Sequence, residues 1–120
     1  MFQQVILVGN VGQDPELRHT TNGNAVANFS LATNQRIKGE ERTEWHRIVC
    51  WAKLAEMVAE HVQKGSSVLV TGELRTRDWE DNEGTKRYTT EVHVRDFRFV
   101  GKRYSADEAE DDDDDIPFDV

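Results

Sequence analysis

A single helix-patterned segment lies between stretches that alternate like β-strands, and this order constrains the fold more than any other feature. In AKLAEMVAEHVQKG, residues 52–65, apolar side chains recur at roughly helical spacing and Gly65 is placed to end the helix. Strand patterns precede it in QQVILVGN, AVANFSLAT and EWHRIVCWA, and follow it in SVLVTGELRTRDW and RYTTEVHVRDFRFVG. The sequence therefore predicts five strands with one helix between the third and the fourth.

This order matches an all-β architecture, the OB-fold, which is a five-stranded, partly open Greek-key barrel. An SH3-like barrel has a similar strand count but usually lacks the interposed helix, so the helix favours the OB-fold. The apolar run VILV predicts a buried first strand, and the polar segment NQRIKGEER, residues 34–42, predicts a mobile loop. The segment EDNEGTK, residues 80–86, predicts the turn of a projecting hairpin.

The acidity of the chain is concentrated at its C-terminus. Of the 23 acidic residues, nine lie in residues 105–120, where there is no basic residue. Residues 1–104 therefore hold 14 acidic residues against all 15 basic ones, so the net charge of −8 says little about what they bind. We expect an OB-fold domain over residues 1–104 and a disordered acidic tail over residues 105–120.

The spacing of histidine, cysteine and glycine residues limits the chemistry that the protein can perform, and its apolar runs indicate its cellular location. The four histidines and the single Cys50 have no metal-ligand spacing, and GNVGQ leads into Pro15 and another strand pattern, not into a helix as a phosphate loop would. We therefore expect a binding protein, not an enzyme, with no cofactor and no metal. The lone cysteine and the lack of a membrane-length apolar run predict a soluble, cytoplasmic protein that binds no membrane.

Tryptophan and arginine share strand faces. Strand alternation places Trp45, Arg47, Val49 and Trp51 together, and Glu73, Arg75, Arg77 and Trp79 together. A single tryptophan is more often a core or interface residue, but a core does not easily accept the neighbouring arginines. Exposed indoles beside guanidinium groups are typical of surfaces that bind single-stranded nucleic acid. Duplex readout is not expected, because the helix carries two glutamates, Glu56 and Glu60.

Several blocks together resemble the bacterial single-stranded DNA-binding protein (SSB) family: VILVGNVGQDPELR, NGNAVANFSLAT, TEWHRIVCWAKLAE, KGSSVLVTGELRTRDW and RYTTEVHV. The resemblance implies a sequence-nonspecific protein, usually a homotetramer, that coats single-stranded DNA (ssDNA) in replication, recombination and repair. It implies base stacking on Trp45, Trp51 and Trp79, the second of which is often Phe in the family. It implies backbone contacts from Arg47, Lys53, Lys64, Arg75 and Arg77. It also places His46 at a subunit interface, although a half-buried strand histidine is an equal alternative.

The chain departs from the family at two positions. The loop after the second strand commonly carries another stacking aromatic residue, where this chain has Ile37. We expect the basic residues of that loop to contact DNA in its place: Arg36, Lys38 and Arg42. Asp78 stands where a lysine is frequent. Both departures predict weaker binding per domain.

An apolar tip follows the acidic run at the C-terminus. The segment comprises Asp111, Asp112, Asp113, Asp114, Asp115, Ile116, Pro117 and Phe118. An acidic run alone indicates a solubilising tail, but the resemblance implies a docking site for helicases, exonucleases, polymerase subunits and recombination mediators. The family tip normally ends at Phe, whereas Asp119 and Val120 follow here. The sequence therefore predicts weakened or altered docking.

Three alternatives remain open from the residues. One is a replication-restart OB-fold protein, which generally lacks an acidic tail. Another is an acidic adaptor or DNA mimic that binds a basic protein surface. The third is an RNA-binding protein of the cold-shock kind.

Overall fold

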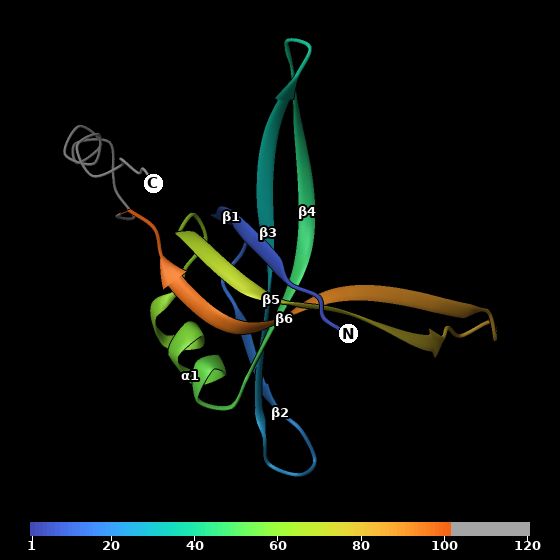
Figure 1. Cartoon of the computed structure of the whole chain (residues 1–120). Coiled ribbons are helices and arrows are strands. Elements are labelled where there is room, and N and C mark those ends of the chain that lie inside the picture. The colour runs from blue at the N-terminus through green and yellow to red at the C-terminus, as the bar shows by residue number, and fades with distance from the viewer. Residues whose placement is uncertain (102–120) are drawn as a thin grey trace.

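The computed structural model describes residues 1–101 (Figure 1), so the predictions for the acidic tail and its docking residues, Asp111 to Phe118, lie outside the described residues. The elements are β1 (Val5–Val11), β2 (Glu16–His19), β3 (Ala25–Ile37), β4 (Glu40–Trp51), α1 (Ala52–His61), β5 (Ser67–Glu80) and β6 (Lys86–Phe99). The helix follows the third long strand and precedes the fourth, as predicted. The short β2 is an addition that pairs with β3.

The strands form one sheet that closes on itself. Its order is β1-β5-β6-β4-β3-β2, and β1 also pairs with β3 through Asn10 opposite Ala32 and Val11 opposite Leu31. The β4–β6 pairing is parallel, whereas the other pairings are antiparallel. The five long strands therefore form a closed barrel with one helix, which confirms the predicted OB-fold.

Strand alternation builds the core. The alternation in AVANFSLAT puts Ala25, Ala27, Phe29 and Leu31 of β3 on one face, and the structure buries that face. Ile48 and Cys50 of β4 and Val68 and Val70 of β5 meet them inside the barrel. The helix α1 adds Ala55 and Val58 to the same cluster and lies beside β3 and β4. Burial of these apolar side chains is the main term that stabilises a barrel of this size.

Two expectations about apolar residues are wrong. Ile6 and Val8 of β1 are each more than half exposed, because alternate residues of a strand point to opposite faces and the inward positions are those of Val5, Leu7 and Val11. Strand alternation predicts Leu74 on the same, interior face of β5 as the buried Val68 and Val70, yet Leu74 is exposed. Beyond Gly72, β5 pairs only with β6 and has left the barrel wall.

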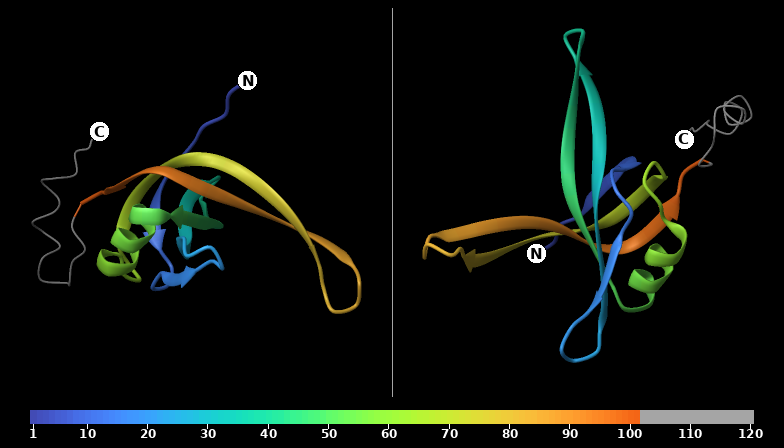
Figure 2. Two further views of the ribbon diagram at one scale, coloured as in Figure 1. Left: turned by 90° about the horizontal axis from the view of Figure 1, so that it is seen from below. Right: turned by 180° about the vertical axis from the view of Figure 1, so that it is seen from behind.

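Two long hairpins extend from the barrel in different directions (Figures 1 and 2). The β3–β4 hairpin replaces the predicted mobile loop at residues 34–42, so that prediction is wrong. Its turn consists of Lys38 and Gly39, both with positive φ, as a two-residue hairpin turn requires. Opposite charges then face each other at Arg36 and Glu41, which favours the paired strands.

The β5–β6 hairpin extends on the side opposite to α1 (Figure 2). Its turn confirms the hairpin predicted at residues 80–86. The Asp81 carboxylate accepts hydrogen bonds from the backbone N–H groups of Thr85 and Glu83 and from the Arg87 side chain. These bonds, the one from Thr85 foremost, lower the pKa of Asp81. The ionised carboxylate of Asp81 therefore holds the turn of the β5–β6 hairpin in place.

Candidate nucleic-acid interface

A groove of about 250 Å³ lies between the outer face of β3 and β4 and the β5–β6 hairpin. Its polar lining comprises Gln13, Glu16, Arg18, Asn28, Ser30, Arg47, Arg77 and Glu91, so three arginines face two glutamates. Two of the predicted phosphate-binding residues, Arg47 and Arg77, are therefore brought together, although they lie on strands separated by α1 in the sequence. A groove with polar side chains and converging guanidinium groups suits a sugar–phosphate backbone.

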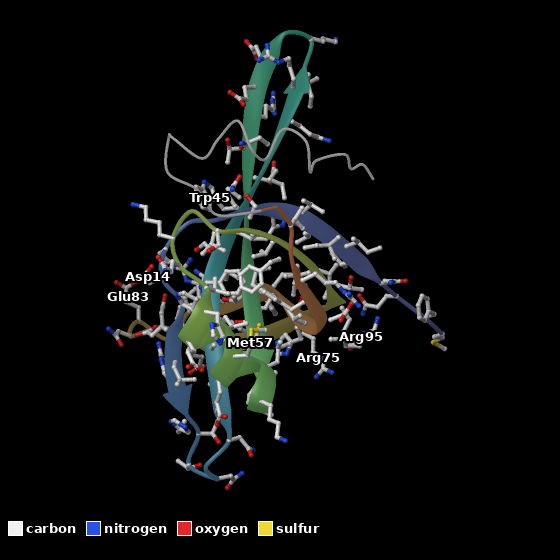
Figure 3. All side chains as sticks on the ribbon, turned by 90° about the vertical axis from the view of Figure 1, so that its left-hand side faces the viewer. Asp14, Trp45, Met57, Arg75, Glu83 and Arg95 are labelled. Carbon is white, nitrogen blue, oxygen red and sulfur yellow. The ribbon has the colours of Figure 1, made fainter. Side chains whose placement is uncertain are left out.

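The three tryptophans are exposed, as their shared faces with arginine predicted. Trp45 is 61% exposed, Trp51 41% and Trp79 43%. Trp45 lies where the β3–β4 hairpin leaves the barrel (Figure 3), and its ring packs over the backbone of Gly12. Trp79, farther out on the β5–β6 hairpin, donates its indole N–H to Thr89 Oγ1 at 3.0 Å. The rings of Trp45 and Trp79 are thus each held at one side and still offer surface for stacking.

The predicted cations differ in their electrostatic surroundings. Arg77 Nε lies 3.2 Å from Glu91 Oε2, and an Arg75 nitrogen lies 3.3 Å from Glu73 Oε1. Within residues 1–101, Arg47 has no ion-pair partner. Arg47 is therefore the cation of the groove whose charge is least compensated by the fold itself.

The remaining predicted cations lie away from the groove lining. Arg36, Lys38 and Arg42 are exposed at the outer end of the β3–β4 hairpin, beside the exposed Ile37. Lys53 is in the first turn of α1, and Lys64 follows the helix, where its backbone N–H donates to Asp14 Oδ1 at 2.9 Å. Their contact with nucleic acid stays a prediction. Asp78 forms an exposed ion pair with Lys86 at 3.6 Å, so its charge is partly offset.

Sequence reasoning missed six polar groove residues: Gln13, Glu16, Arg18, Asn28, Ser30 and Glu91. The sequence pattern could have indicated two of them, because Asn28 and Ser30 are the polar residues on the outer face of an alternating strand. Arg18 belongs to β2, the short strand that follows Pro15, and it pairs with Glu16 at 3.2 Å. His46 is half-buried, with Nε2 3.0 Å from Thr33 Oγ1, so this strand histidine has a partner within its own chain.

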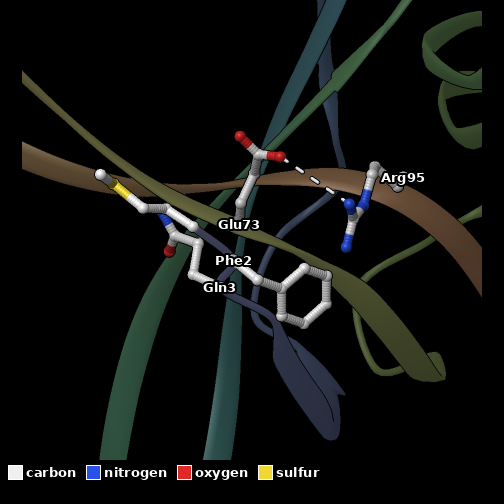
Figure 4. A pocket seen from close by; sticks show the side chains of 5 residues that line it. Phe2, Gln3, Glu73 and Arg95 are labelled. Atoms are coloured by element: carbon white, nitrogen blue, oxygen red, sulfur yellow. Dashed lines mark ion pairs between the residues drawn. The ribbon is translucent and has the colours of Figure 1, made fainter.

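A second pocket, of about 420 Å³, is formed by the N-terminal residues and the base of the β5–β6 hairpin (Figure 4). Arg95 and Glu73 form an ion pair there at 3.9 Å. The Gln3 side chain donates to Leu74 O and accepts from Leu74 N, so it continues the strand pairing of β5 beyond β1. None of the three tryptophans is among the lining residues of this pocket or of the groove.

The metal-ligating and nucleophilic side chains of residues 1–101 are scattered or buried. In this range, no three His, Cys, Asp or Glu side chains gather to hold a metal ion, and no helix has the length and hydropathy needed to span a membrane. Burial raises the pKa of Cys50 to about 12, which keeps its thiol protonated and poorly nucleophilic.

The closed barrel, with its exposed indoles beside a cationic groove, defines an OB-fold protein with the surface of a nucleic-acid binder. The model of the single-strand binding protein family matches residues 2–100, and the chain belongs to this family. A solved structure described as the Plasmodium falciparum SSB complex with ssDNA superposes with a TM-score of 0.77 at 31% sequence identity. The match covers 83% of this chain and 96% of that chain.

Proposed function

We propose that this protein binds ssDNA without sequence specificity, through stacking of bases on Trp45, Trp51 and Trp79. The observation that carries the proposal is the exposure of all three indoles beside the groove that contains Arg47 and Arg77. Membership of the single-strand binding protein family supports it, as does the likeness to the Plasmodium falciparum SSB structure, which is a complex with ssDNA. The protein acts in this proposal as a binder and carries out no catalysis.

Stacking and charge have separate roles in this mechanism. Every base has a π-face, so an indole platform contributes about 1–3 kcal/mol per base whatever the sequence. The guanidinium groups neutralise phosphates and release counterions, which makes the affinity depend on salt. The two hairpins lengthen the surface available to a strand, with Trp79 on one and Arg36, Lys38 and Arg42 on the other.

Titration with oligo(dT) tests this function. Tryptophan fluorescence should be strongly quenched at low salt and should recover at high salt. A duplex of the same length is the control and should quench little. Absence of quenching by oligo(dT) would refute ssDNA binding and favour the adaptor or DNA-mimic alternative, whereas a preference for oligo(rU) would indicate an RNA-binding protein.

We further propose that the domain of residues 1–104 coats ssDNA in replication, recombination and repair, while residues 105–120 recruit partner enzymes. Five aspartates, Asp111 to Asp115, provide long-range attraction to a basic surface, and Phe118 provides an apolar anchor. Deletion of residues 105–120 should tighten ssDNA binding slightly, since the tail competes with DNA, and abolish capture of the partner enzymes. Unchanged recruitment after the deletion would contradict the docking role.

Self-association into a homotetramer is proposed from the family resemblance and from the outer face of β1. Ile6 and Val8 expose apolar surface on adjacent outward positions of this strand. Exposed apolar surface of this kind is typical of protein contact sites. Mass photometry of the wild type should show tetramers, and Ile6→Lys with Val8→Lys should shift the distribution to smaller species. A wild type that stays monomeric at micromolar concentration would contradict the proposal.

A further inference from the structure

A continuous hydrogen-bonded chain joins Trp51 to Arg77 through two side chains of β6. Trp51 Nε1 lies 3.1 Å from His93 Nδ1, and the two ring planes are inclined by 28° with their centroids 6.2 Å apart. His93 Nε2 lies 3.2 Å from Glu91 Oε1, and Arg77 Nε lies 3.2 Å from Glu91 Oε2. The chain therefore crosses from β4 through β6 to β5.

Donors and acceptors along this chain have only one consistent order. An indole N–H only donates, so His93 Nδ1 must accept and the ring proton must be on Nε2. His93 Nε2 then donates to Glu91 Oε1, and the second carboxylate oxygen accepts from Arg77. The His93 and Glu91 side chains are only 18% and 12% exposed, so water competes little for these bonds.

From this arrangement we propose that His93 and Glu91 are positioning residues that hold Trp51 and Arg77 in fixed relation for ssDNA. The proposal rests on the proposed binding function. Trp51 is the last residue of β4 and is partly exposed, so without His93 its ring can rotate about its side-chain bonds. Freezing that rotation at the moment of binding costs conformational free energy. A preformed network removes that cost, so the base on Trp51 and the phosphate on Arg77 are bound as a unit.

A competing role for this network is that Glu91 only offsets the charge of Arg77 and His93 only fills space. Substitution of His93 by neutral residues distinguishes this role from the proposed one, because it leaves the Glu91–Arg77 ion pair and the charge of the surface in place. His93→Ala removes the acceptor for the Trp51 indole. His93→Gln retains a carbonyl oxygen that can accept from Trp51 and an amide that can donate to Glu91. His61→Ala, on the exposed side of α1, is the matched control.

Oligo(dT) affinity is measured for these variants in the full chain and again in a Trp51→Phe background, which keeps an aromatic ring but has no N–H. In the protein that retains Trp51, we expect His93→Ala to weaken oligo(dT) binding about three- to tenfold, which is the range for one lost hydrogen bond. In the Trp51→Phe protein, the same substitution should weaken binding less than twofold. His93→Gln should restore most of the affinity, and His61→Ala should change nothing. An equal loss from His93→Ala in both backgrounds would overturn the proposal.

Nitrogen-15 NMR of the DNA-free protein gives a readout that does not depend on binding. His93 should show an unprotonated Nδ1 and a protonated Nε2, and the Trp51 indole proton should shift toward the solvent-exposed position in His93→Ala. A Trp51 indole signal that His93→Ala leaves unmoved would refute the hydrogen bond. Failure of the wild type to bind oligo(dT) would instead refute the proposed function, and the two failures are thereby told apart.

Discussion

The ring of Trp45 packs so closely over Gly12 that a β-carbon at position 12 would overlap the indole. Gly12 follows β1, whereas Trp45 lies in β4, so the contact joins distant parts of the chain. Gly9 is equally crowded, but there the obstacle is the backbone of Ala32. A side chain at the surface can move aside, whereas a strand of a closed barrel cannot.

These two glycines give a paired prediction. Gly12→Ala should leave the melting temperature nearly unchanged but displace Trp45 and weaken oligo(dT) binding several-fold. Gly9→Ala should destabilise the fold by about 1–3 kcal/mol through overpacking, with little effect on the affinity of the protein that remains folded. Thermal melting and fluorescence titration of both variants check this. A Gly12→Ala variant with wild-type affinity would show that the position of Trp45 is unimportant.

Ile37→Trp should strengthen ssDNA binding about tenfold, because an indole at the end of the β3–β4 hairpin adds a stacking platform near Arg36 and Lys38. Ile37→Leu is the control, since it keeps an apolar side chain without a π-face. Oligo(dT) long enough to reach the hairpin is titrated against all three proteins. Unchanged or weaker binding by Ile37→Trp would exclude this hairpin from the DNA path.

Arg47→Ala should reduce the salt dependence of binding. Loss of one phosphate contact lowers the slope of log affinity against log salt concentration by about 0.7 for a single strand. Arg98→Ala is the control, because Arg98 is exposed and paired with Asp96 on β6 at 3.4 Å, outside the groove lining. Titrations at several salt concentrations measure both slopes. The same slope for Arg47→Ala as for the wild type would remove Arg47 from the proposed interface.

The buried thiol of Cys50 should make stability fall in alkali. Its pKa is raised from 9.0 to about 12, so the folded state holds this proton more tightly than the unfolded state. The contribution is complete below pH 9 and is lost between pH 9 and about 12, at up to about 1.4 kcal/mol per pH unit. Urea unfolding at a series of alkaline pH values should give a flatter dependence for Cys50→Ala.

The same thiol should react with a disulfide reagent at pH 8 only after unfolding, because Cys50 is buried. Fast reaction in the native state would contradict both expectations for Cys50.

Much of the barrel and part of the interface follow from local periodicity in the sequence. Two-residue alternation grouped Phe29 and Leu31 on one face of their strand, and placed Trp45 and Arg47 together on an exposed face. The helix between the third and fourth long strands followed from its apolar spacing. These properties belong to single elements, so neighbouring residues suffice to determine them.

Only the tertiary structure determines those features that depend on contacts between residues far apart in the sequence. The exposure of Ile6, the extension of β3 and β4 into a long hairpin, and the groove that joins Arg47 to Arg77 result from how strands pair. His93 carried no signal in the sequence, because it is 42 positions from its partner Trp51. Closure of the barrel sets β6 parallel to β4, with His93 opposite Val49, and this pairing brings the imidazole to the indole.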